Sequence, residues 1–202
     1  MRNFEYVLPE EYIEAKIIDA KNTKTMIILN VAAILIAAIL IYIGIQISNA
    51  IYGKIAINND FILNNFNEIY IYCFSFIGVL IVVTILHELI HGLFYKIYTK
   101  QKLRFGISLS CAFCGIPDIY VYRKAMIITA IAPCIIISSI FLVLMIFCNN
   151  QWMFLLYLIT FASHFAGCIG DIYSVKLLLF KYKNENTLIN DTGPKQTIYI
   201  KK

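Results

Sequence analysis

Four separate stretches of apolar residues, each long enough to cross a bilayer, constrain this chain more than any other feature. They cover about residues 26–48, 69–95, 125–148 and 152–180. A helix of roughly 18 to 20 apolar residues spans the hydrocarbon core of a membrane. The composition agrees, because 60% of the residues are hydrophobic and 14% are charged, against roughly 45–50% and about 25% in soluble domains. We therefore expect an integral membrane protein.

The lysines and arginines predict how the spans are oriented. Most of them lie in residues 1–25, 96–124 and 181–202, whereas the 49–68 loop and the "NNQ" turn hold few. Positively charged loops remain on the cytoplasmic side. We therefore expect a cytoplasmic or interfacial segment at 1–25, a membrane domain at 26–180 and a cytoplasmic tail at 181–202, with both termini cytoplasmic and the protein in a bacterial cytoplasmic membrane. The net charge of +5 bears on this topology, and we expect no nucleic-acid partner.

The polar segments suggest some local structure. Residues 9–22, "PEEYIEAKIIDAKN", look helical. Within residues 103–122, "LRFGISLS" and "IPDIYVYR" flank the "CAFCG" turn region and favour a short β-hairpin. An extended peptide could add to the exposed edge of such a hairpin. The expected fold is thus an all-α polytopic membrane protein with about four transmembrane helices and a short β-hairpin in the cytoplasmic loop.

The second apolar stretch contains the ionisable sequence "HELIH", with His87, Glu88 and His91. On a helix, side chains at i and i+4 lie on one face, so both imidazoles can bind one zinc ion. A neighbouring carboxylate can then act as the base for a metal-activated water. Because ionisable groups inside a membrane are costly, we interpret the motif as a metal site with Glu88 as its base.

The fourth stretch supplies candidates for a third ligand in "SHFAGCIGDIY". His87 lies 18 residues after Ile69, and Asp171 lies 19 residues after Trp152, so the two have similar depth in helices that run in the same direction. We prefer Asp171 as the third ligand, because a carboxylate beside zinc is compensated; the alternative is an aspartate at a helix end. His164 could stabilise an oxyanion, bind substrate, be a ligand itself, or form a hydrogen bond between helices.

The pair "CAFC" at 111–114 has the spacing of a redox or zinc site. It lacks a second pair and a nearby histidine, and the loop is expected to face the reducing cytoplasm. We interpret most of the six cysteines as small buried apolar residues.

Several of these motifs together resemble the bacterial membrane zincin family, which is similar to the site-2 intramembrane metalloproteases. The resemblance covers about residues 70–195 and rests on "HELIHGLF", "YRKAMIITAIAP", "GD" and "NDTG". It implies that His87, His91 and Asp171 bind one zinc ion and that Glu88 is the base. His164 stands near the place of an asparagine in site-2 proteases. The proline and leucine of their aspartate motif are absent here, and a glycine precedes Asp171.

We therefore expect a zinc-dependent intramembrane or membrane-interface metallopeptidase that hydrolyses a membrane protein or membrane-proximal peptide in contact with the lipid bilayer. Two other functions fit the same residues. One is a zinc-binding membrane protein without proteolytic activity. The other is a small transporter in which His87, His91, His164 and Asp171 form a path for protons or metal ions.

Overall fold

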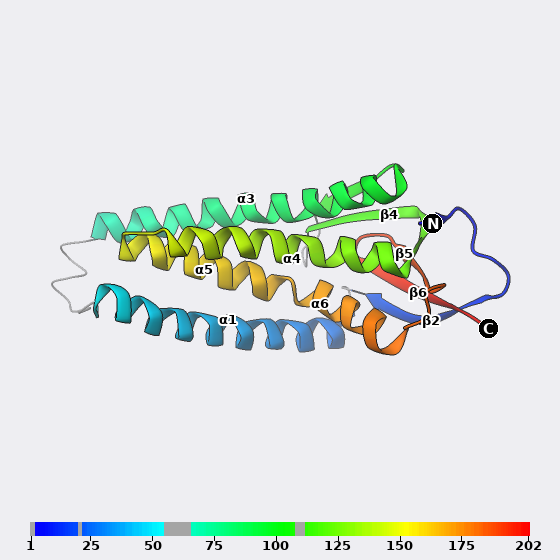
Figure 1. Ribbon diagram of the computed structural model, residues 1–202, viewed down its shortest axis with the longest axis horizontal. Coiled ribbons are helices and arrows are strands. Elements are labelled where there is room, and N and C mark those ends of the chain that lie inside the picture. The colour runs from blue at the N-terminus through cyan, green and yellow to red at the C-terminus, as the bar shows by residue number, and fades with distance from the viewer. Residues whose placement is uncertain (1–2, 20–21, 55–65, 108–111) are drawn as a thin grey trace.

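A bundle of long helices with a β-sheet at one end makes up the molecule (Figure 1). The computed structural model describes residues 3–19, 22–54, 66–107 and 112–202. Both termini lie at the sheet end (Figure 1). The helices are, in chain order, α1 (Thr23–Tyr52), α3 (Phe66–Thr99), α4 (Arg123–Ile146), α5 (Gln151–Gly167), α6 (Ile169–Lys176) and the π-helical turn η1 (Leu177–Lys181).

Local capping explains where two of the helices begin. The side chain of Asn22 accepts a hydrogen bond from the backbone N–H of Thr25 at the start of α1. Asn150 does the same for Met153 at the start of α5. Both asparagines satisfy a backbone donor that the first turn of a helix leaves without a partner.

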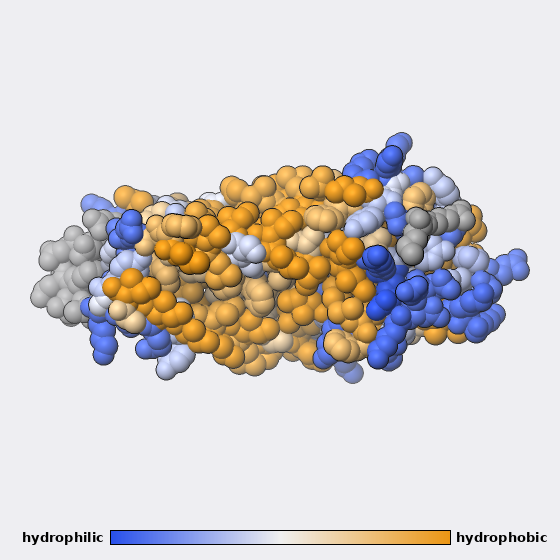
Figure 2. All heavy atoms as spheres, in the orientation of Figure 1, coloured by the Kyte–Doolittle hydropathy of each residue, from blue (hydrophilic) through white to orange (hydrophobic). Residues whose placement is uncertain are grey.

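Three of these helices are long and apolar enough to cross a membrane: α1, α4 and the Ile69–Thr99 part of α3. A fourth span exists if α5 and the following helix, residues 169–181, are counted as one span that is bent by 41°. Figure 2 shows apolar side chains over the helical body and hydrophilic ones gathered at the sheet end. This distribution is that of a membrane protein with a polar end outside the hydrocarbon layer.

The predicted fourth span, 152–180, is therefore a broken helix. The break lies at Cys168, which ends α5 and begins α6. Gly167 and Gly170 flank the break, and glycine is a poor helix former at which helices commonly kink.

A six-stranded antiparallel sheet forms the polar end of the molecule. Five strands follow the order β1-β4-β5-β6-β2, and β3 pairs with β4 beside this path. The strands are β1 (Phe4–Glu5), β2 (Tyr12–Asp19), β3 (Arg104–Ile107), β4 (Ala112–Tyr122), β5 (Leu188–Asp191) and β6 (Lys195–Lys201). A hairpin forms within residues 103–122, but its second strand differs from the prediction. Residues 112–115, which lie in the expected "CAFCG" turn region, are strand and pair with β3, from Arg104 opposite Gly115 to Ile107 opposite Ala112.

The expected all-α fold with a single hairpin is wrong, because the N-terminal segment and the tail also form strands. Residues 9–22 contain β2 instead of a helix, and β2 pairs with β6 from Tyr12 opposite Lys201 to Asp19 opposite Lys195. The apolar spacing of β2 looks helical, but its isoleucines also favour strands. Pairing with β6, about 180 residues away in the sequence, favours the strand over the helix. The protein is a mixed α and β structure.

A hydrophobic core at the boundary between helices and sheet holds the two parts together. It joins Tyr95 of α3, Ile116 and Val121 of β4, and Leu178 of η1. A second cluster, with Val83, Ile137, Phe141 and Phe161, lies within the helical body. The "HELIH" segment of α3 lies between the two clusters in sequence, so packing fixes the helix on both sides of it.

Candidate metal centre

Helix α3 presents His87 and His91 on one face, as their spacing predicts. The Nε2 atoms of the two rings lie 3.1 Å apart. The ring centroids are separated by 4.7 Å, and the ring planes are nearly perpendicular. Two imidazole nitrogens thus converge on one point beside the helix.

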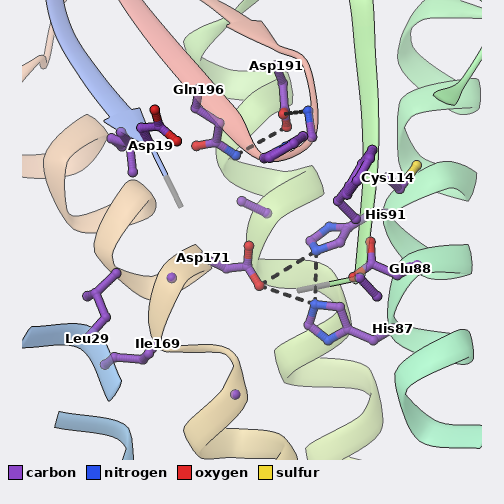
Figure 3. A pocket seen from close by; sticks show the side chains of 18 of the residues that line it. Asp19, Leu29, His87, Glu88, His91, Cys114, Ile169, Asp171, Asp191 and Gln196 are labelled. Carbon is purple, nitrogen blue, oxygen red and sulfur yellow. Dashed lines mark hydrogen bonds and ion pairs between the residues drawn. The ribbon is translucent and has the colours of Figure 1, made fainter. Parts of the chain in front are cut away.

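Asp171 points at the same place from α6 (Figure 3). Its Oδ2 atom lies 3.2 Å from Nε2 of His87 and 3.6 Å from Nε2 of His91. The helix break at Cys168, three residues before this aspartate, is where α6 begins. The structure therefore brings together the three residues that were predicted from the sequence as metal ligands.

The three ligand atoms fit a zinc ion. Ligands about 2.0 to 2.1 Å from a tetrahedral ion are about 3.3 Å apart, and the three separations here are 3.1, 3.2 and 3.6 Å. His87, His91 and Asp171 are one of two groups of described residues that could hold a metal ion. Two imidazole nitrogens and a carboxylate oxygen are a donor set that zinc takes in catalytic sites.

The second nitrogen of His91 has a partner of its own on α4. Nδ1 of His91 lies 2.9 Å from the backbone carbonyl oxygen of Thr129. A carbonyl oxygen only accepts hydrogen bonds, so Nδ1 carries the proton, and Nε2 of the neutral ring offers a lone pair to the site. Sequence reasoning missed this contact.

Pro133 explains why that carbonyl is free. Proline has no backbone N–H, so Pro133, inside α4, cannot make the helical hydrogen bond to the carbonyl four residues earlier, which is that of Thr129. The freed oxygen is buried and needs a donor. The proline of "AIAP" in the third apolar stretch was the sequence signal for this arrangement.

His164 lies on the other side of His87. Its Nε2 atom is 3.2 Å from Nδ1 of His87, whereas Nε2 of His87 faces Asp171. The Sγ atom of Cys168 lies 3.9 Å from the same Nδ1 and 3.7 Å from Nε2 of His164. His87, His164 and Cys168 form the second group that could hold a metal ion.

The hydrogen-bond pattern favours metal binding by Nε2 of His87, with His164 as a hydrogen-bond partner instead of a ligand. If Nε2 of His87 binds a metal ion, its Nδ1 carries the proton and donates it to Nε2 of His164. His164 then carries its own proton on Nδ1, which is buried and has no hydrogen-bond partner in the described part of the chain. The position thus supports an orienting role for His164.

Glu88 lies beside the two histidines and borders the same cavity (Figure 3). Its carboxylate accepts a hydrogen bond from the backbone N–H of Cys114 in β4. The first half of β4 therefore holds the candidate base in place.

The cavity around these residues has a volume of about 260 Å³. Its walls come from the end of β2, the start of α1, α3, β4, α4, α6 and the turn between β5 and β6. Met26 and Leu29 of α1 also line this space. The cavity therefore lies where the helices meet the sheet (Figure 1).

The pair "CAFC" has no clear part in the centre. Cys111 lies outside the described residues. Cys114 is buried, and burial, with nearby Glu88 and Asp191, raises the pKa of its thiol to about 12. Its thiol is protonated at neutral pH, so Cys114 lacks the thiolate of a reactive redox cysteine.

Comparison with known proteins supports the chemistry of the site. No curated protein and no solved structure matches the chain. A family described as "Putative zincin peptidase" matches residues 80–185. This range is just over half of the chain and contains His87, Glu88, His91, His164 and Asp171. The chain therefore belongs to the zincin peptidase family.

Proposed function

We propose that the protein is a zinc-dependent metallopeptidase that hydrolyses peptide bonds of membrane-protein or membrane-proximal substrates, within the bilayer or at its surface. The observation that carries the proposal is the convergence of His87, His91 and Asp171 beside Glu88 in one cavity. Family membership supports it.

Each residue has a definite task in this proposal. His87, His91 and Asp171 hold zinc, which when bound acidifies a water molecule and polarises the substrate carbonyl. Glu88 takes the proton of the attacking water and delivers it to the leaving amine. Thr129 and His164 keep the two histidine rings in the orientation and tautomer that ligation requires.

The position of the cavity supports a membrane substrate. Apolar helices form one part of its wall and strands of the polar end form another, so a peptide could reach it from the bilayer or from its surface. By the distribution of lysine and arginine, we propose that the sheet end and both termini are cytoplasmic, in a bacterial membrane.

The hairpin offers a place for an extended substrate. Ala112, Phe113 and Cys114 of β4 pair with β3 along one edge and also line the cavity. We propose that a locally unwound segment of substrate lies along this part of β4, because extended peptides bind by adding to a strand. We also propose a mechanism similar to that of site-2 proteases, with His164 near the place of their asparagine.

Exchange of Glu88 for glutamine tests the proposal. Wild type and Glu88→Gln are reconstituted in liposomes with a pool of labelled synthetic single-span peptides, and fragments are identified by mass spectrometry. We expect cleavage by the wild type and a loss of about 10²-fold or more in the variant, with one zinc per chain in both. Glu185→Gln, which changes an exposed loop carboxylate, is the matched control and keeps wild-type cleavage.

Three results would count against the proposal. Equal cleavage by wild type and Glu88→Gln would remove Glu88 as the base. Zinc binding without any cleavage by the wild type would support the zinc-binding protein without proteolytic activity, and movement of zinc or protons into the liposomes would support the transporter.

A further inference from the structure

A chain of four polar side chains connects α3 with α6 through the C-terminal hairpin of β5 and β6. The hydroxyl of Tyr95 on α3 donates to Oδ2 of Asp191 on β5. Nε2 of Gln196 on β6 donates to the same oxygen at 3.2 Å. Ser174 on α6 donates to Oε1 of Gln196 at 2.7 Å. The hairpin thus touches both helices that carry the candidate ligands.

Each end of this chain lies about one helical turn beyond a candidate metal ligand. Tyr95 follows His91 by four residues on α3, and Ser174 follows Asp171 by three residues on α6. Residues three or four apart lie on the same face of a helix. A shift of Tyr95 therefore moves His91 on the same face of α3, and a shift of Ser174 moves Asp171 on the same face of α6.

The connection is buried and firmly held. Tyr95, Ser174 and Asp191 are each 3% exposed or less, and hydrogen bonds in a low-dielectric interior are strengthened. The other carboxylate oxygen of Asp191 accepts the backbone N–H of Gly193 at 2.8 Å. Gly193 has a φ of 95°, a conformation that favours glycine, so this bond fixes the turn of the hairpin.

The two ligand-bearing helices need such a connection. In the part of the chain that the structure describes, α3 and α6 each pack mainly on α4 instead of on each other. Packing between them therefore contributes little to the distance between the histidines and Asp171.

We propose that the C-terminal hairpin is a brace that sets this distance, with Tyr95, Asp191, Gln196 and Ser174 as positioning residues for the metal centre. The inference rests on the proposed function only in taking His87, His91 and Asp171 as zinc ligands. It assigns a role to the "NDTG" segment at 190–193, which contributes no candidate ligand.

Two variants that keep side-chain volume test the brace in the full-length protein in detergent. Tyr95→Phe removes one hydroxyl, and Gln196→Met removes both hydrogen bonds of Gln196 at similar size. Zinc affinity is measured by competition with a chromogenic chelator. We expect each variant to bind zinc about tenfold more weakly, the lower end of the range for residues that support metal ligands.

The double variant separates positioning from general destabilisation. If both residues act through one chain, the double variant binds zinc about as weakly as the weaker single variant, since coupled residues are not additive. Losses that multiply would overturn the proposal. Lys201→Met, on the same strand as Gln196, breaks the exposed ion pair of Lys201 with Glu11. It is the control and keeps wild-type affinity.

Hydrogen exchange without zinc distinguishes failure of the brace from failure of the metal site. We expect Gln196→Met to speed amide exchange in residues 169–176 and to leave α1 unchanged. If the wild type binds no zinc, the metal centre fails, and faster exchange in α6 alone still supports the brace. Unchanged zinc affinity or unchanged α6 exchange in the variant would overturn it.

Discussion

Nδ1 of His91 lies 2.9 Å from the backbone carbonyl oxygen of Thr129. The contact joins α3 to α4, and it exists because Pro133 leaves that carbonyl without its helical donor. A hydrogen bond missing from one helix therefore sets the tautomer of a histidine on another.

Pro133→Ala should separate helix stability from metal affinity. The new N–H at position 133 would donate to the Thr129 carbonyl and compete with His91. We expect the thermal unfolding temperature to rise, because proline inside a helix costs about 3 kcal/mol, while zinc affinity falls by up to about tenfold. Ile135→Ala, at a lipid-facing position of α4, is the control. Unchanged zinc affinity in Pro133→Ala would show that the freed carbonyl is not needed.

His164 should support zinc binding without being a ligand. We expect His164→Ala to lower zinc affinity by about 10 to 100-fold and to keep a stoichiometry of one zinc per chain. His164→Gln offers an amide oxygen that can accept from Nδ1 of His87 and should restore much of the affinity. If His164→Ala abolishes zinc binding and His164→Gln gives no rescue, His164 is a ligand.

Gly115 should tolerate no larger side chain. A Cβ atom there would meet backbone atoms of Thr192 and Gly193 in the β5–β6 turn, and backbone cannot move aside as a flexible side chain can. Gly115→Ala should therefore lower the free energy of unfolding by about 1 to 3 kcal/mol, as measured by chemical denaturation. Gly78→Ala, in α3 with open space around it, should be neutral or stabilising by up to about 1 kcal/mol. Equal effects of the two variants would contradict the close approach.

Asp191 should make stability depend on pH. Burial, opposed by hydrogen bonds from Tyr95 and Gly193, raises the pKa of its carboxyl from 3.8 to about 6. Between these values the folded protein binds a proton that the unfolded chain does not, so stability falls as the pH rises through this window. Thermal unfolding at pH 4.5 and pH 7 should show a smaller fall in Asp191→Asn than in wild type. An identical fall in both would rule out Asp191 as its source.

The sequence predicted the centre better than the fold around it. The spacing of His87 and His91 on one helix predicts that their rings converge, and equal depth points to Asp171; the structure brings all three together. The role of His164 was open, because spacing cannot tell which nitrogen of His87 faces it. Only the contact with Nδ1 shows that it lies away from Asp171.

Most strands of the sheet could not be predicted from their own local sequence. The residues of β2 look helical in the sequence, since Ile13, Ile17 and Ile18 have near-helical spacing. Their partner strand β6 lies in the polar tail. The β3–β4 hairpin joins segments close in sequence, and a hairpin within residues 103–122 was predicted. Short polar strands that pair with distant parts of the chain have little recognisable pattern in their own sequence. An apolar span is recognised from its own run of about 20 residues.

Anomalous diffraction at the zinc edge from crystals of the full chain tests the central claim most directly. The account predicts one zinc per chain, within about 2.0 to 2.2 Å of Nε2 of His87, Nε2 of His91 and a carboxylate oxygen of Asp171. A chain without stoichiometric zinc would contradict the account. So would zinc bound instead by Nδ1 of His87, His164 and Cys168.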